Sequence, residues 1–235
     1  MDSTDNDNIN STSSLSRSSA RFVIIIIAIQ ILIALITYPF LPEKVPSHWN
    51  ISGQVDSSMP KLISAILWPG ITIVMYFLLR RLIAAGPQFG RTNQRTSLEF
   101  VDRLLPALAL LFLAIQLITI ATALHFVVNV PFIISLLLSL LFIYIGNFLG
   151  KLRRNYWAGI RTPWTLASDV VWERTHRLGG WLFVAAGLVG VFTSFIPPLR
   201  LWGTVGAILV ASAITGIYSY VIYQRLEANG REPFA

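Results

Sequence analysis

Six stretches of the chain lack Asp, Glu, Lys and Arg and are long enough, or nearly so, to cross the hydrocarbon core of a membrane. Apolar residues follow one another along these stretches without the alternation that membrane β-strands require. Backbone polar groups in lipid must be satisfied within the segment, so the pattern predicts α-helices. The expected fold class is an all-α integral membrane protein with six transmembrane helices, at residues 22–41, 62–79, 104–124, 132–149, 181–199 and 201–223.

The composition agrees with lipid as the main solvent of the chain. Its 235 residues are 54% hydrophobic and 12% charged, whereas about a quarter of the residues in a soluble domain are charged. Fifteen of the eighteen Lys and Arg residues fall in segments that would share one side of the membrane with both termini. Basic residues near membrane helices are retained in the cytoplasm, so we predict a multi-pass cell-membrane protein with cytoplasmic N- and C-termini. The net charge of +7 then reflects topology and anionic lipid, and no direct nucleic-acid binding is expected.

The polar segments divide the chain into four predicted parts. Residues 1–20 are rich in Ser, Asn and Asp and are expected to be a disordered cytoplasmic tail. Residues 21–103 form an N-terminal membrane hairpin with an outer loop and a basic cytoplasmic linker, and residues 104–223 form a four-helix membrane core. Residues 224–235 are a cytoplasmic C-terminal tail. The outer loop, residues 42–61, has a density of Pro and Gly that favours a compact loop over a helix.

Polar residues inside the predicted helices are few and neutral, the amides being Gln30, Gln116 and Asn147. Ion-coupled transporters usually place ionisable groups at membrane depth, so the pattern disfavours that class. Gln30 and Gln116 are expected to form hydrogen bonds between helices. The absence of cysteine excludes a disulfide and a thiolate metal site, and no cofactor is expected.

The outer loop allows two interpretations. Glu43, His48 and Asp56 could form a metal or acid–base cluster, but a zinc site needs three or four ligands and the other two histidines are expected to lie elsewhere in the fold. The alternative is structural, with Asn50 and Gly53 shaping a turn. We therefore predict no metal site.

The connection between the fourth and fifth helices, residues 146–180, is the most distinctive polar segment. It contains three tryptophans and six basic residues, which a passive tether does not need. If the fourth helix continues past the lipid, Asn147, Lys151 and Arg154 lie on one face at three- and four-residue spacing. The alternative is a membrane anchor, in which the tryptophans form an aromatic belt and the arginines bind lipid phosphates.

Two short interfacial helices are predicted in this connection, separated by an arginine-bearing turn. Thr165 or Ser168 could cap the second of them, which would end at residues 179–180. Within that helix Trp172 and His176 are four residues apart and are expected to stack. The segment is thus predicted to be a shaped surface along the inner leaflet.

Residues in both polar segments match the pattern of a known family. The matching residues are Asn147, Lys151, 153–155, 159–166, Trp172 and 175–180 in the inner segment, and Pro46, 48–50, Gly53, Asp56 and Lys61 in the outer loop. With these residues, the inner segment resembles the core of the SdpI-type immunity protein family, and the outer loop resembles the domain of unknown function that often precedes that core. Together the resemblance covers about residues 22–223.

The resemblance implies a bacterial or archaeal membrane protein that protects its cell from a secreted killing peptide. In its best-known form the family also signals, by holding a soluble transcriptional repressor at the membrane. Neither role needs catalysis, so the chain is expected not to be an enzyme. The expected ligand-binding residues of the outer loop are His48, Trp49, Asn50, Gly53, Asp56 and Lys61. The expected partner-binding residues of the cytoplasmic motif are Asn147, Lys151, Arg154, Asn155, Gly159, Arg161, Thr162, Pro163, Trp164, Thr165, Trp172 and His176.

Two other classes of function are alternatives. A transporter, or a protein that handles lipid or peptide, would use the basic inner segment to grip an anionic headgroup. A membrane enzyme is disfavoured because the chain has no HExxH motif, no cysteine and no carboxylate within the predicted helices.

Overall fold

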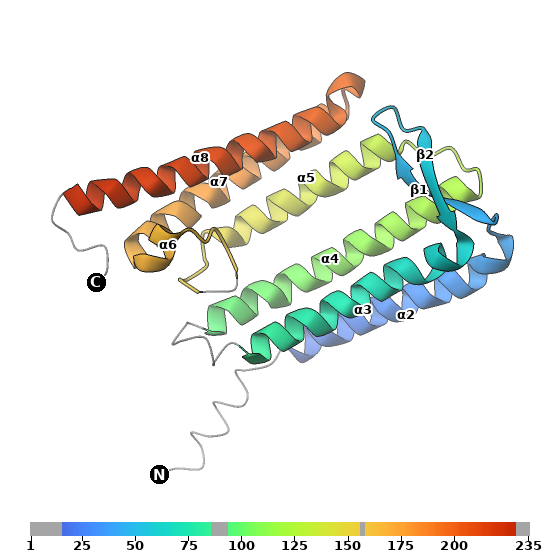
Figure 1. Cartoon of the computed structure of the whole chain (residues 1–235), viewed down its shortest axis with the longest axis horizontal. Helices are drawn as coiled ribbons and strands as arrows, with labels where there is room; N and C mark the ends of the chain where they lie inside the picture. Colours follow the sequence, from blue (N-terminus) through green and yellow to red (C-terminus); the bar gives the residue numbers. More distant parts are fainter. Residues whose placement is uncertain (1–15, 86–93, 156–157, 229–235) are drawn as a thin grey trace, which may run out of the picture.

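Six long helices run side by side and make up most of the molecule (Figure 1). The structure, a computed structural model, describes residues 16–85, 94–155 and 158–228. Within these residues, each of the six helices is long and apolar enough to cross a membrane. The predicted number and order of the membrane helices are therefore confirmed. They are α2 (Arg17–Thr37), α3 (Lys61–Ala85), α4 (Gln94–Ala123), α5 (Val130–Leu149), α7 (Asp169–Ser194) and α8 (Arg200–Ala228).

The short elements lie at the two ends of the helices. One end carries η1 (Tyr38–Phe40), the strands β1 (Lys44–Trp49) and β2 (Val55–Pro60), and η3 (Pro197–Leu199), which makes the sharp turn between the last two helices. We call this the hairpin end. The opposite end carries α6 (Pro163–Ala167), and α2 begins and α8 ends there (Figure 1). We call it the α6 end; its placement in the cytoplasm stays a prediction.

The outer loop is an antiparallel β-hairpin, at a place where the sequence favoured a compact loop over a helix and did not indicate strands. Pro46 and Pro60 weaken the strand signal, because proline cannot donate a ladder hydrogen bond. The structure accommodates Pro60 at the end of β2, and the register shifts between Pro46 and His48. Val45 is fully buried and packs with Leu41 and with residues of α4, which fixes the hairpin on the helices.

The helices pack as two groups. In one group α4 packs on α2 and α3, and in the other α7 packs extensively on both α5 and α8. The contact between α4 and α5 is much smaller. The predicted division at residues 103 and 104 placed the third membrane helix with the last three; that division stays a prediction, although the packing groups α4 with α2 and α3.

Three predictions at the α6 end are wrong. Helix α5 ends at Leu149 with Gly150 as its cap, so it does not carry Lys151 and Arg154 on a continued face. Helix α7 runs without a break through Gly179 and Gly180, so the predicted second interfacial helix is its first part. These two glycines pack closely against neighbouring elements, and a Cβ on Gly180 would approach the Gly146 carbonyl oxygen to 2.8 Å. They therefore serve helix packing rather than helix termination.

The third correction concerns the N-terminal tail, predicted to be disordered through residue 20. Helix α2 already begins at Arg17, with Ser16 as its N-cap. The Asp102 carboxylate of α4 accepts hydrogen bonds from the Ser16 backbone N–H at 2.9 and 3.0 Å. A contact distant in the sequence therefore orders the polar start of the helix. Residues 1–15 lie outside the described part of the chain.

Candidate functional site

The turn of the β-hairpin is built by Asn50. Its side-chain oxygen accepts hydrogen bonds from the backbone N–H groups of Ser52 and Gln54, both at 3.0 Å. Gly53 has φ +80°, a left-handed conformation that favours glycine. A Cβ on Gly53 would lie 3.0 Å from Pro131 at the start of α5. The tip of the hairpin therefore lies against α5, while its base packs on α4, so the hairpin bridges the two helix groups.

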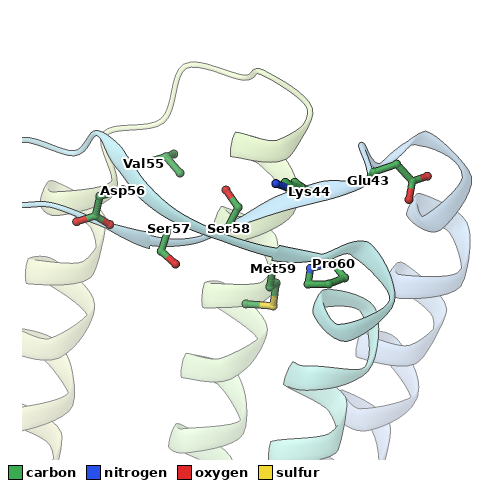
Figure 2. Close-up of a pocket in the computed structure, with 8 residues that line it drawn as sticks. All are labelled: Glu43, Lys44, Val55, Asp56, Ser57, Ser58, Met59 and Pro60. Carbon is green, nitrogen blue, oxygen red and sulfur yellow. The ribbon is translucent and has the colours of Figure 1, made fainter.

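Two polar side-chain pairs lie on the hairpin and at its base. His48 Nδ1 lies 2.6 Å from an Asp56 carboxylate oxygen, and Lys61 Nζ lies 2.7 Å from Glu43. Figure 2 shows Asp56 and Glu43 at opposite ends of the hollow that β2 lines. The structure thus joins His48 to Asp56 but keeps Glu43 apart from them. Among the described residues, no group of three or more His, Cys, Asp or Glu side chains could hold a metal ion.

At the α6 end, His176 and Trp172 hold the connection against α7. The Ile160 backbone N–H donates to His176 Nε2 at 2.8 Å, and His176 Nδ1–H donates to the Trp172 carbonyl at 2.8 Å. Trp172 Nε1–H donates to the Leu152 carbonyl at 2.7 Å. The two rings stack with centroids 3.9 Å apart, as predicted. Since Nε2 accepts and Nδ1 donates, the imidazole of His176 is neutral in this arrangement.

A capping box forms the turn that precedes α6. Thr165 Oγ1 accepts from the Thr162 backbone N–H at 2.8 Å, and Thr162 Oγ1 accepts from the Thr165 N–H at 3.2 Å.

Asn155 closes the preceding turn by accepting from the Ala158 N–H at 2.8 Å. Arg154 pairs with Asp169 at 2.8 Å, next to Ser168, which caps α7. Every one of these contacts stays within the connection and α7.

The predicted partner-binding residues therefore divide by exposure. Asn155, Thr165, Trp172 and His176 are buried and shape the connection from inside. Trp164 packs on α8, where its Nε1–H donates to Ser219 at 2.7 Å, a contact that no pattern in the sequence indicated. Arg154 and Thr162 are half-buried. The exposed members are Asn147, Lys151, Gly159, Arg161 and Pro163.

The predicted hydrogen bonding of Gln30 and Gln116 is present only in part. Gln116 Nε2 donates to the Gln30 backbone carbonyl at 2.9 Å. Within the described residues, both amide atoms of the Gln30 side chain, Gln116 Oε1 and Trp68 Nε1 are buried without a hydrogen-bond partner. Gln116 and Trp68 line a small cavity between α2, α3 and α4, beneath the hairpin. Unpaired polar groups at membrane depth are costly, so this cavity is a second candidate site.

Gly159→Ala is expected to release the connection from α7. Gly159 has φ +109°, and a Cβ there would overlap His176 Nε2, the acceptor for Ile160. The strain costs about 1–3 kcal/mol. Trypsin added to membranes should then cleave after Arg161 several-fold faster than in the wild-type protein. The control is Gly206→Ala, because Gly206 has no neighbouring atom within 4 Å of a built Cβ. Equal cleavage of both variants would contradict the role of His176.

These features define the class of the protein: a multi-pass membrane protein with a β-hairpin at one end and a folded polar connection at the other. Residues 151–223 match the SdpI/YfhL protein family, and residues 25–73 match a domain of unknown function, DUF1648. The resemblance predicted from the sequence is thereby confirmed, and the chain carries an SdpI/YfhL family region behind a DUF1648 region.

A particular relative matches over nearly the whole length. The immunity protein SdpI of Bacillus subtilis (strain 168) is 26% identical over 202 residues, which are 86% of this chain and 94% of that protein. The shared region is thus long enough to include both the hairpin and the connection around α6. No solved structure matches the chain.

Proposed function

We propose that this protein protects its cell from a secreted antimicrobial peptide, and that it does so by binding rather than by catalysis. The observation that carries the proposal is the match to an immunity protein across both ends of the fold. The distribution of basic residues supports placing the α6 end and both termini in the cytoplasm, with the hairpin outside. A peptide arriving from outside would then meet the hairpin first.

The hairpin is the proposed receiving surface for the peptide. Its His48 and Asp56 side chains are exposed, and Lys61 and Glu43 form a second polar pair at its base. Trp49 pairs with Val55 at the end of the strands, Asn50 holds the turn, and the tip touches α5. The unpaired polar atoms of Gln116 and Trp68 beneath the hairpin would accept and donate hydrogen bonds to a peptide that inserts between α2, α3 and α4.

We further propose that the α6 end reports peptide binding to a soluble transcriptional repressor. The exposed residues at this end include Lys151 and Arg161, while Trp172 and His176 would set the conformation of the connection. Such signalling requires two states of the protein that differ in their affinity for the peptide. A direct contact between the repressor and His176 would require the connection to open, because His176 is fully buried.

The first test compares the native host with and without this gene. Both strains are exposed to spent stationary-phase medium of the host, and membrane potential is recorded. Collapse only in the deletion strain, with rescue by the wild-type gene, is the expected result. Equal behaviour of the two strains would count against self-immunity and would favour the sensing of a foreign peptide.

Within this assay, the double substitution His48→Ala and Asp56→Ala is expected to weaken protection. The highest concentration of spent medium at which the membrane potential is kept should fall at least tenfold. The matched control is Ser47→Ala with Ser57→Ala, which removes another exposed side-chain contact of the same hairpin, 3.3 Å long. Equal protein levels in the membrane are verified by immunoblotting. Full protection by the His48 and Asp56 double variant would show that this surface of the hairpin is not needed for binding the peptide.

A second candidate function is the handling or transport of lipid or peptide. The small contact between α4 and α5 favours it, because two weakly joined helix groups can move against each other. Flux of a labelled lipid or peptide in proteoliposomes above that of empty vesicles would support this class. No excess flux would leave protection by binding as the better account.

A further inference from the structure

The groove between α4 and α5 at the α6 end carries two basic side chains around one aromatic ring. The guanidinium of Arg103 lies 4.5 Å from the centroid of the Phe148 ring, and Lys151 Nζ lies 5.4 Å from the same centroid. Arg103 belongs to α4, whereas Lys151 follows the end of α5. Two elements distant in the sequence therefore bring two positive charges to one place.

Within the part of the chain that the structure describes, neither of these cations forms an ion pair. Among the described residues, the ion pairs are His48–Asp56, Glu43–Lys61 and Arg154–Asp169, so Arg103 and Lys151 take part in none. Glu99 also lines the groove, but it forms no ion pair with Arg103 or Lys151. The groove therefore carries a net positive charge beside the aromatic ring of Phe148.

The position of the groove along the helices matches the edge of the hydrocarbon core. Arg103 directly precedes the apolar stretch of α4, which starts at residue 104, and Lys151 lies two residues beyond the apolar stretch of α5. The two helices are antiparallel (Figure 1), and both cations lie over the same Phe148 ring, so they lie at one level along the helices. Next to the groove, Leu104 and Ile145 line a shallow apolar depression between the two helices, and Tyr144 donates to the Arg103 carbonyl there at 3.1 Å.

We infer that this groove binds an anionic phospholipid, with the headgroup phosphate between Arg103 and Lys151 and an acyl chain along Leu104 and Ile145. Basic pockets between membrane helices at this depth attract anionic headgroups. The apolar depression next to the groove favours a lipid over a free phosphate, which would gain nothing from it. The lipid would also add contacts between the two helix groups, since the contact of α4 with α5 is small.

Native mass spectrometry of the full-length protein in mild detergent tests this inference, with phosphatidylglycerol and phosphatidylcholine of equal chain length as probes. The wild-type protein is expected to prefer phosphatidylglycerol. Arg103→Gln with Lys151→Gln should weaken that binding about 30-fold, since each basic group near the surface contributes about 1 kcal/mol and 1.4 kcal/mol is tenfold. The control is Arg81→Gln with Arg174→Gln, which removes two exposed charges at the same end and should change binding less than about threefold.

Three outcomes would overturn the inference. They are equal binding of the two lipids by the wild-type protein, an equal loss in the control variant, and displacement of the lipid by millimolar inorganic phosphate. If the double variant does not fold, Lys151→Gln alone decides, because Lys151 is exposed and lies outside any helix. An unchanged preference for phosphatidylglycerol in that variant would then overturn the inference.

Discussion

Replacing Gly146 by alanine is expected to lower the free energy of unfolding by about 3 kcal/mol, a large effect for one methyl group. A Cβ on Gly146 would lie 2.7 Å from the Gly180 carbonyl oxygen and 2.8 Å from the Val184 backbone nitrogen. Both neighbours are backbone atoms of α7, which cannot turn away as a flexible side chain can. Helices α5 and α7 would have to separate along their extensive contact. Thermal unfolding in a fixed detergent measures the change.

Gly216→Ala is the matched control for this substitution. Gly216 also lies within a membrane helix, α8, but a Cβ there would meet no atom within 4 Å. Alanine should therefore leave stability unchanged or raise it by up to about 1 kcal/mol, the difference in helix propensity. Similar unfolding temperatures for the two variants would show that α5 and α7 do not approach at Gly146 as closely as described.

The sequence predicted the membrane helices well because lipid leaves the backbone few alternatives. A long apolar stretch without charges must satisfy its own hydrogen bonds, and in these stretches only an α-helix does so. The ends of the helices were less predictable, because contacts distant in the sequence decide them. Helix α2 starts at Arg17 since Asp102 holds Ser16, and α7 passes through Gly179–Gly180 since α5 packs there.

The candidate site could be located from the sequence, but the roles of its residues could not. Trp172 and His176 stack as their spacing predicts. The spacing does not reveal that His176 Nε2 accepts a hydrogen bond from the Ile160 N–H, next to Gly159. Likewise, the prolines of the outer loop weaken the strand signal in the sequence. The hairpin is held in place by the burial of Val45 against α4. Such contacts join segments far apart in the chain, and no local pattern encodes them.

Gln30→Leu is expected to stabilise the protein while weakening protection against the peptide. The Gln30 side chain is fully buried, and among the described residues its amide makes no hydrogen bond. Removing it costs no bond and relieves the penalty of a buried unpaired amide, about 1–3 kcal/mol. Protection should fall in the membrane-potential assay because, in the proposed function, polar groups between α2, α3 and α4 serve the inserted peptide.

Thr204→Val provides the contrast, because it removes a polar group whose hydrogen bonds are made. Thr204 Oγ1 contacts Ser135 Oγ at 2.6 Å and donates to the Arg200 carbonyl at 3.0 Å, so valine of similar shape should lower the unfolding temperature. Lower stability of Gln30→Leu would mean that its amide has a partner in the membrane-embedded protein. Higher stability with full protection would mean that the amide takes no part in peptide binding. Only the combination of gained stability and lost protection agrees with an amide that is kept unpaired for the peptide.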